Sequence, residues 1–196
     1  MPAGFKYDMN PIEKVMPEMC RFETVYRLSG GFNLDISNLA GVDAIPPLTP
    51  VVIDFVTRKA VAVINVEVVE SISAGATALK VKKGSLVGVG AHLGNGSNGG
   101  TVTAIDKSNA DYDLVTLAEG STLAAQKGAV LFEATAVAGK TPKATANFLN
   151  YAWTKVVEGA TITAIGRAYE IRPTRLIAPI SEKDKATLGD RFLFTY

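Results

Sequence analysis

The segment Gly94-Asn-Gly-Ser-Asn-Gly99 has the glycine spacing of a dinucleotide-binding motif. In that motif a helix follows the glycines, and its N-terminus holds the pyrophosphate. Here the following residues, Gly100-Thr-Val-Thr-Ala-Ile105, alternate in the manner of a strand. Glycine-rich segments between strands form tight turns because glycine tolerates positive φ angles. We therefore predict a turn here, and we predict no cofactor-binding residues.

The chain contains one histidine, His92, and one cysteine, Cys20. A Ser-His-Asp or Cys-His catalytic site would depend entirely on His92. One histidine and one cysteine are too few for an ordinary zinc site, and a single cysteine forms no intrachain disulfide. We interpret His92 as a structural residue and Cys20 as a small buried side chain, and we predict no catalytic residues and no enzymatic activity.

Three aspartates, Asp106, Asp111 and Asp113, lie around Tyr112 and could offer oxygen ligands to calcium. Their spacing matches neither the order of an EF-hand loop nor its terminal glutamate. Aspartate side chains commonly accept hydrogen bonds from nearby backbone amides in turns. We therefore interpret the three residues as turn formers and predict no metal ligands.

The charge of the chain is nearly balanced, with 20 basic and 19 acidic side chains. A net charge of +1 provides no field that would concentrate the protein on a nucleic-acid backbone. The densest basic cluster, Lys80, Lys82 and Lys83, alternates with Leu79 and Val81, which is typical of a strand with one solvated face. Nucleic acid is therefore not an expected partner.

The sequence also gives no sign of a membrane protein. The first residues lack an apolar signal-peptide core. The longest apolar-rich run, Ala60–Val69, is interrupted by Asn65 and Glu67 and is too short to span a bilayer. We expect synthesis in the cytoplasm and no membrane partner.

The elements that must position these residues are mostly strands. Alternating or β-branched segments bounded by Gly, Asn, Asp or Ser predict strands at 21–28, 51–56, 60–69, 78–81, 87–93, 101–105, 114–117, 130–138, 161–171 and 191–195. A helix is predicted over 144–157, where Ala146, Leu149, Trp153 and Val156 recur at helical spacing. A second helix is predicted over 182–188, capped by Ser181 and Asp184.

Residues 1–45 differ from the rest of the chain. Proline breakers, the pair Gly30-Gly31 and weak periodicity predict an extended N-terminal arm whose order depends on tertiary or quaternary contacts. Residues 46–196 are predicted to form the globular domain. Regular short strands with turn residues between them favour a mainly β, β-rich α+β fold with a few short helices, built as a small sandwich or barrel.

Three segments carry a resemblance to a known family. They are Pro46-Pro-Leu-Thr-Pro-Val-Val-Ile-Asp-Phe-Val-Thr-Arg-Lys-Ala60, Thr101-Val-Thr-Ala-Ile-Asp-Lys-Ser-Asn-Ala-Asp-Tyr-Asp113, and Asn147-Phe-Leu-Asn-Tyr-Ala-Trp153 with Ser181-Glu-Lys-Asp-Lys185. With these segments the chain resembles the head fiber proteins of phages and prophages of Bacteroides-type gut bacteria.

The resemblance implies a virion structural protein on the outside of the phage head. Its partners would be the major capsid protein or other head proteins and further copies of itself, with a homotrimer as the expected oligomer. With this resemblance, we expect the arm of residues 1–45 to contact the capsid or a neighbouring subunit. The chain shows no heptads or collagen-like repeats, so we expect a compact knob and not a long rod. An alternative function is a carbohydrate-binding adhesin for a host-surface glycan, with Tyr112, Trp153 and Tyr169 as candidate aromatic platforms. For Trp153, its place on the apolar face of the expected helix favours core packing instead.

Overall fold

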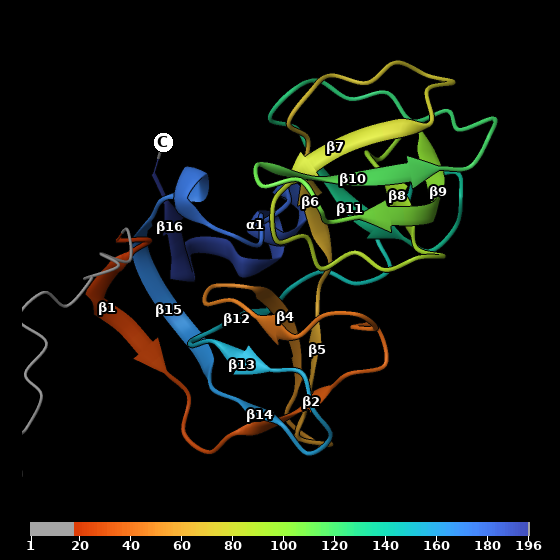
Figure 1. The fold of residues 1–196 in the computed structure, drawn as a ribbon. Coiled ribbons are helices and arrows are strands. Elements are labelled where there is room, and N and C mark those ends of the chain that lie inside the picture. Colours follow the sequence, from red (N-terminus) through yellow and green to blue (C-terminus); the bar gives the residue numbers. More distant parts are fainter. Residues whose placement is uncertain (1–17, 196) are drawn as a thin grey trace, which may run out of the picture.

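The computed structural model describes residues 18–195, whose regular secondary structure consists mainly of short strands in two curled sheets (Figure 1). Within these residues, helical structure is limited to the α-helix α1 (Glu182–Leu188) and two 3₁₀ helices of three residues each. The predicted mainly β class is confirmed.

The first sheet is built from both ends of the described chain. Its strands follow the spatial order β1-β15-β12-β4-β5-β2-β14, with β16 beside β15. Their bounds are β1 Arg21–Arg27, β2 Phe32–Asp35, β4 Pro50–Asp54, β5 Lys59–Ala62, β12 Phe148–Asn150, β14 Thr161–Ile162, β15 Ala164–Ile171 and β16 Phe192–Phe194. A two-stranded ladder pairs β3 (Ala44–Ile45) with β13 (Thr154–Lys155). We call residues 18–64 and 141–195, which carry these strands and α1, the outer lobe.

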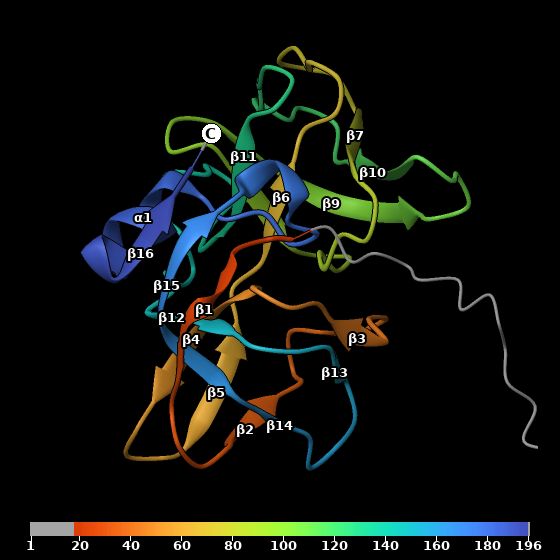
Figure 2. The same ribbon diagram turned by 90° about the vertical axis from the view of Figure 1, so that its left-hand side faces the viewer.

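The second sheet comes from one continuous piece of chain, residues 65–140, which we call the inserted lobe. Its strands follow the order β6-β11-β8-β9-β10-β7. Their bounds are β6 Asn65–Glu67, β7 Ala78–Lys82, β8 His92–Gly94, β9 Gly99–Asp106, β10 Tyr112–Leu117 and β11 Val130–Ala134. A β-bridge between Val68 and Val81 brings the two edges of this sheet together, so the sheet curls back on itself. The inserted lobe lies at one end of the outer lobe (Figures 1 and 2).

The apolar run Ala60–Val69 crosses from one lobe to the other. Its sequence predicts a single strand, but the run supplies β5 to the outer lobe and β6 to the inserted lobe. At the crossing, the Val63 N–H donates to the Pro50 carbonyl at 2.9 Å, and the Ile64 carbonyl accepts from the Glu133 N–H at 2.9 Å. The extended backbone therefore changes its hydrogen-bonding partners from one sheet to the other within two residues.

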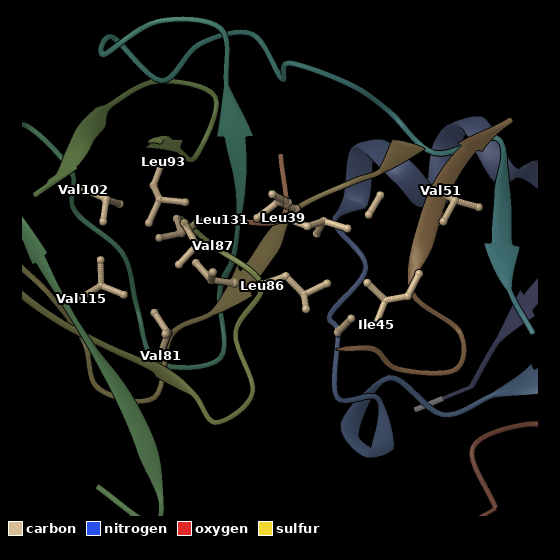
Figure 3. Packing of buried hydrophobic residues seen from close by; sticks show 14 of the residues in the cluster. Leu39, Ile45, Val51, Val81, Leu86, Val87, Leu93, Val102, Val115 and Leu131 are labelled. Carbon is tan, nitrogen blue, oxygen red and sulfur yellow. The ribbon is translucent and has the colours of Figure 1, made fainter. Parts of the chain in front are cut away.

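Both lobes contribute to one large hydrophobic cluster. Figure 3 shows Ile45 and Val51 of the outer lobe on one side of it and Val102 and Val115 of the inserted lobe on the other. Leu131 of β11 is fully buried between them. The lobes share a core, so they depend on each other for the burial of apolar surface.

Helix α1 has the capping box predicted for it. The Asp184 N–H donates to Ser181 Oγ at 3.2 Å, and the Ser181 N–H donates to Asp184 Oδ2 at 3.2 Å. The helix ends at Gly189, whose φ is 60°. Both ends therefore follow from local sequence, because the capping residues satisfy backbone groups that the helix leaves free.

The carboxylate of Asp184 also joins the two lobes. It is 1 % exposed and accepts hydrogen bonds from Asn65 Nδ2 at 2.7 Å and from the Ala146 N–H at 2.8 Å. Asn65 is the first residue of β6. A single buried side chain thus connects α1, the segment before β12 and the first strand of the inserted lobe.

The helix predicted over 144–157 is absent, and this prediction is wrong. The segment contains β12 and β13, and Leu149 is buried in the first sheet. Its backbone finds distant partners: the Asn147 N–H donates to the Val51 carbonyl at 3.1 Å and the Val156 N–H to the Asp43 carbonyl at 2.9 Å. Tertiary hydrogen bonds override the apolar spacing, because a segment containing two asparagines has only a weak intrinsic preference for helix.

The proposed boundary between arm and domain at residue 45 also needs correction. Residues 1–17 lie outside the described part of the chain, so the arm prediction is untested there. Residues 18–45 contain β1, β2 and β3, and Phe32, Leu39 and Ile45 are fully buried in the shared core. Weak periodicity failed as a guide here because these strands are short and are completed by partners more than a hundred residues away, such as Tyr169 opposite Arg21.

Most of the other predicted strands agree with the structure in position. Three are shorter than expected: 51–56 ends at Asp54 in β4, only the end of 87–93 lies in β8, and only the first half of 130–138 lies in β11. Leu86 and Val87 are nevertheless buried. Apolar loop residues that pack inside the curled sheet therefore resemble strand residues in the sequence.

Candidate interaction surface

The glycine segment Gly94–Gly99 forms the turn between the antiparallel strands β8 and β9. The side chain of Asn95 fixes this turn by accepting hydrogen bonds from the N–H groups of Ser97 at 2.9 Å and Asn98 at 2.8 Å. A Cβ atom at Gly94 or Gly99 would overlap the backbone of Gly139. The glycines are needed for a close backbone approach, and the geometry lacks the strand-to-helix connection that a dinucleotide site requires.

His92 and Cys20 lie in different lobes. His92 is half-buried on β8, and its Nδ1 lies 2.8 Å from Oγ1 of Thr101, its cross-strand neighbour. Cys20 is 1 % exposed, and burial together with the nearby Glu18 raises the pKa of its thiol to about 11. A thiol with this pKa remains protonated at neutral pH and is a poor nucleophile.

The three aspartates considered for calcium do not converge. Asp106 accepts a hydrogen bond from the Ser108 N–H, which lowers the pKa of the aspartate. Asp111 is exposed, whereas Asp113 is fully buried and accepts from the N–H groups of Gly84 at 3.1 Å and Ser85 at 2.9 Å. Within residues 18–195, no group of three or more His, Cys, Asp or Glu side chains is placed to hold a metal ion.

The three clustered lysines each have their own carboxylate. Lys80 lies 2.6 Å from Glu70, Lys82 lies 3.2 Å from Glu67, and Lys83 lies 3.0 Å from the buried Asp113. Lys83 also donates to the carbonyls of residues 107 and 109, at 2.5 and 2.7 Å. The cluster is therefore neutralised and holds the β9–β10 loop in place.

A hollow of about 470 Å³ lies at the junction of the lobes. Its wall includes Glu67, Val130, Pro179, Glu182 and Lys185. The charged groups are paired, Glu67 with Lys82 and Glu182 with Lys185 at 2.6 Å. The hollow therefore offers no unpaired acid and base that would act on a substrate.

The candidate aromatic platforms are not brought together either. Tyr112 lies on the inserted lobe beneath the ammonium of Lys80, 5.2 Å from the ring centre. Tyr169 lies on β15, with the guanidinium of Arg167 at 5.8 Å from its ring centre. Trp153 is 51 % exposed in the loop before β13, so the expectation that it packs in the core was wrong. The expected helical face does not exist, and among residues 18–195 no aromatic ring packs against this tryptophan.

Strand β1 offers a surface that the sequence did not single out. It forms one edge of the first sheet, and among residues 18–195 it pairs only with β15. Phe22 and Tyr26 on this strand are 51 % and 58 % exposed. The sequence pattern predicts the strand, but it does not predict that its aromatic side chains are exposed. An alternation of charged and apolar residues fits a strand with one buried face equally well.

Comparisons with known proteins give one match. A model of the head fiber protein family of phages matches residues 13–193. Neither the curated proteins nor the solved structures contain a match. In the described part of the chain, no helix has the length and apolar character needed to cross a membrane.

Proposed function

The chain belongs to the phage head fiber protein family, and from this membership we propose that it binds the outside of the phage head as a homotrimer. As a member of the family it is a virion structural protein associated with the phage head, which confirms the resemblance seen in the sequence. The match over residues 13–193 is the observation that carries the proposal. The host group, Bacteroides-type bacteria, remains a prediction. We propose no catalytic activity.

The open edge of the first sheet supports self-association. An unpaired edge with exposed aromatic side chains is a site where protein chains tend to meet. Phe22 and Tyr26 on β1 provide such an edge. A net charge of +1 opposes association only weakly. We propose that further copies of the chain cover this edge, and that the major capsid protein or another head protein is the other partner.

The proposed capsid contact of the N-terminal arm now concerns residues 1–17 alone. Deleting residues 1–17 should leave the fold intact and weaken decoration of heads. Deleting residues 1–45 should unfold the protein, because it removes β1, β2, β3 and the buried Phe32, Leu39 and Ile45. Circular dichroism separates the two results. A folded 46–196 fragment would contradict the shared core.

A decisive experiment combines light scattering with cryo-electron microscopy. The purified chain should have the mass of a trimer, and a map of the virion should show it on the outer face of the head. A monomer in solution that is also monomeric on the virion would refute the trimer. Absence from the outer face would refute the proposed location.

A second candidate function, adhesion to a host glycan, is favoured by one observation. Trp153 is exposed, and aromatic faces are common contacts for sugars and other ligands. If this candidate function is correct, wild-type protein should bind mucin glycans and Trp153→Ala should not. Val157→Ala is a suitable control, because Val157 is 54 % exposed on the same lobe but carries no aromatic ring. Equal binding by both variants would remove this candidate.

A further inference from the structure

The turn between β4 and β5 presents two large apolar side chains to solvent. Phe55 is 53 % exposed and Val56 is 92 % exposed. The sequence pattern predicts both within a strand, but β4 ends at Asp54. In both views of the ribbon, this turn lies at the end of the outer lobe that faces away from the inserted lobe (Figures 1 and 2).

Hydrogen bonds hold this turn in one conformation. Asp54 accepts from the Val56 N–H at 2.8 Å and from Thr57 Oγ1 at 2.6 Å, and these bonds lower the pKa of its carboxyl group. Arg58 has a positive φ of 58°, and its Nη2 donates to the carbonyls of Gly30 at 2.9 Å and Gly31 at 2.8 Å. Because the exposed residues are already ordered, a partner would lose little conformational entropy by docking on them.

Phe55 is the centre of an aromatic row. Its ring lies edge-on to Phe32, with ring centres 5.6 Å apart, and edge-on to Phe148 at 5.5 Å. Phe32 is buried and Phe148 is half-buried. The row thus anchors the exposed Phe55 to the core of the outer lobe.

An arginine lies at each end of the row. The guanidinium carbon of Arg58 is 4.4 Å from the ring centre of Phe32, and that of Arg191 is 5.0 Å from the ring centre of Phe148. Arg191 also donates to the Asn147 carbonyl at 2.9 Å. Among residues 18–195, no carboxylate lies within ion-pairing distance of either guanidinium. The neighbouring acid, Asp54, uses its oxygens to hold the turn.

We propose that this surface, the hairpin-tip face formed by Phe55, Val56, Arg58 and Arg191, binds an acidic polypeptide segment that also carries an apolar side chain. Carboxylates of the partner would pair with the two guanidinium groups, which retain free N–H donors. The apolar side chain would cover Phe55 and Val56. A polypeptide fits better than a glycan because Val56 protrudes, whereas sites for small ligands are concave. Identification of the partner as a head protein rests on the proposed function.

The first test uses a random copolymer of glutamate and tyrosine as the probe, with polyglutamate and heparin for comparison. Fluorescence anisotropy should show that the full chain binds the copolymer more tightly than polyglutamate or heparin. Val56→Asp and Arg191→Glu should each weaken this binding at least about tenfold, since a few residues carry most of the binding free energy of such interfaces and arginine is common among them. Val89→Asp and Arg167→Glu are matched controls. Val89 is 67 % exposed on the inserted lobe, and Arg167 lies over Tyr169 without an ion pair among residues 18–195. Both controls should bind like the wild type.

Unchanged copolymer binding by Val56→Asp and Arg191→Glu, or a preference for polyglutamate or heparin, would overturn the proposal. Circular dichroism of each variant excludes unfolding as the cause of a loss.

The second test measures decoration of phage heads that lack this protein. Val56→Asp and Arg191→Glu should decorate less than the two control variants. If they decorate as well as the wild type, the hairpin-tip face is not the contact with the head. If the wild type binds the copolymer through this face but does not decorate heads, the proposed function fails and the binding site stands.

Discussion

The two lobes differ in how the edge strands of their sheets are paired. The inserted lobe is one continuous stretch of chain, and a bridge between Val68 and Val81 joins the edges of its sheet. The outer lobe is assembled from the two ends of the described chain and leaves β1 as an open edge. Among the described residues, the only large apolar side chains exposed on the inserted lobe are Val89 and Val137. The others lie on the outer lobe, so we expect the outer lobe to contact partners and the inserted lobe to be a rigid cap.

The largest loss of stability is expected for Asp184→Ala, and this variant tests whether the two lobes unfold together. Asp184→Ala removes the acceptor for Asn65, Ala146 and Ser181, and leaves buried donors without partners. The free energy of unfolding should fall by about 3 to 5 kcal/mol. Urea unfolding of the variant should still show one transition, because the two lobes share a hydrophobic core.

The control for this variant is Asp190→Ala, which changes an exposed acid near the end of α1 and should cost no more than about 0.5 kcal/mol. Two separate transitions in the Asp184 variant would contradict the coupling of the lobes through their shared core. A loss no larger than that of the control would contradict the stabilising role of the buried carboxylate.

The next prediction concerns the tight packing of the inserted lobe. Gly139 has a φ of +66°, and a Cβ atom there would overlap the backbone of Asn98. Gly139→Ala should therefore lower the free energy of unfolding by about 2 to 4 kcal/mol, from backbone strain and overpacking together.

Gly88 provides the matched control, because its φ lies outside the left-handed range and a Cβ atom added there would have open space around it. Gly88→Ala should change stability by no more than about 0.5 kcal/mol. If chemical denaturation shows the same change in the free energy of unfolding for both substitutions, the close approach of the loops that contain Asn98 and Gly139 is contradicted.

A smaller effect should appear in the outer lobe at alkaline pH. The pKa of the Cys20 thiol rises from an ordinary 9.0 to about 11 in the fold. Between these values the unfolded chain releases a proton that the native protein keeps, so stability falls as pH rises from about 9 to about 11. At pH 10 the loss should be about 1 kcal/mol.

Cys20→Ala should remove this loss. The measurement is the stability difference between wild type and variant at about pH 7.5 and at about pH 10, on either side of the onset of thiol ionisation in the unfolded chain. The smaller side chain lowers the free energy of unfolding by the same amount at both pH values, so this contribution cancels. If the free energies of unfolding of wild type and variant change in parallel with pH, the raised thiol pKa is contradicted.

The smallest effect is expected for His92 on the inserted lobe. His92→Ala removes one contact of a half-buried side chain with Thr101 and should cost about 0.5 kcal/mol. Decoration of heads should be unchanged, which is checked by sedimentation of heads with bound protein. Loss of decoration by a variant with an intact fold would show that the inserted lobe carries a functional surface.

The sequence by itself determined the features that depend on neighbouring residues. The capping box of Ser181 and Asp184, the turn at Gly94–Gly99 and the strands β7, β9 and β10 of the inserted lobe follow from short-range patterns. Strands close in sequence pair with each other there, as β9 pairs with β10. Turn residues between two short strands are then sufficient to indicate the pairing.

The tertiary structure decided what depends on residues far apart in the chain. Residues 144–157 form strands and not the predicted helix, because Asn147 accepts a hydrogen bond from β4 and Leu149 pairs with both β4 and β15. The tertiary structure also incorporated residues 18–45 into the outer lobe and exposed Phe55, Val56 and Trp153. Spacing along a sequence shows which residues are apolar. Whether an apolar residue is buried depends on the segments that fold against it, and in the outer lobe these come from the opposite end of the chain.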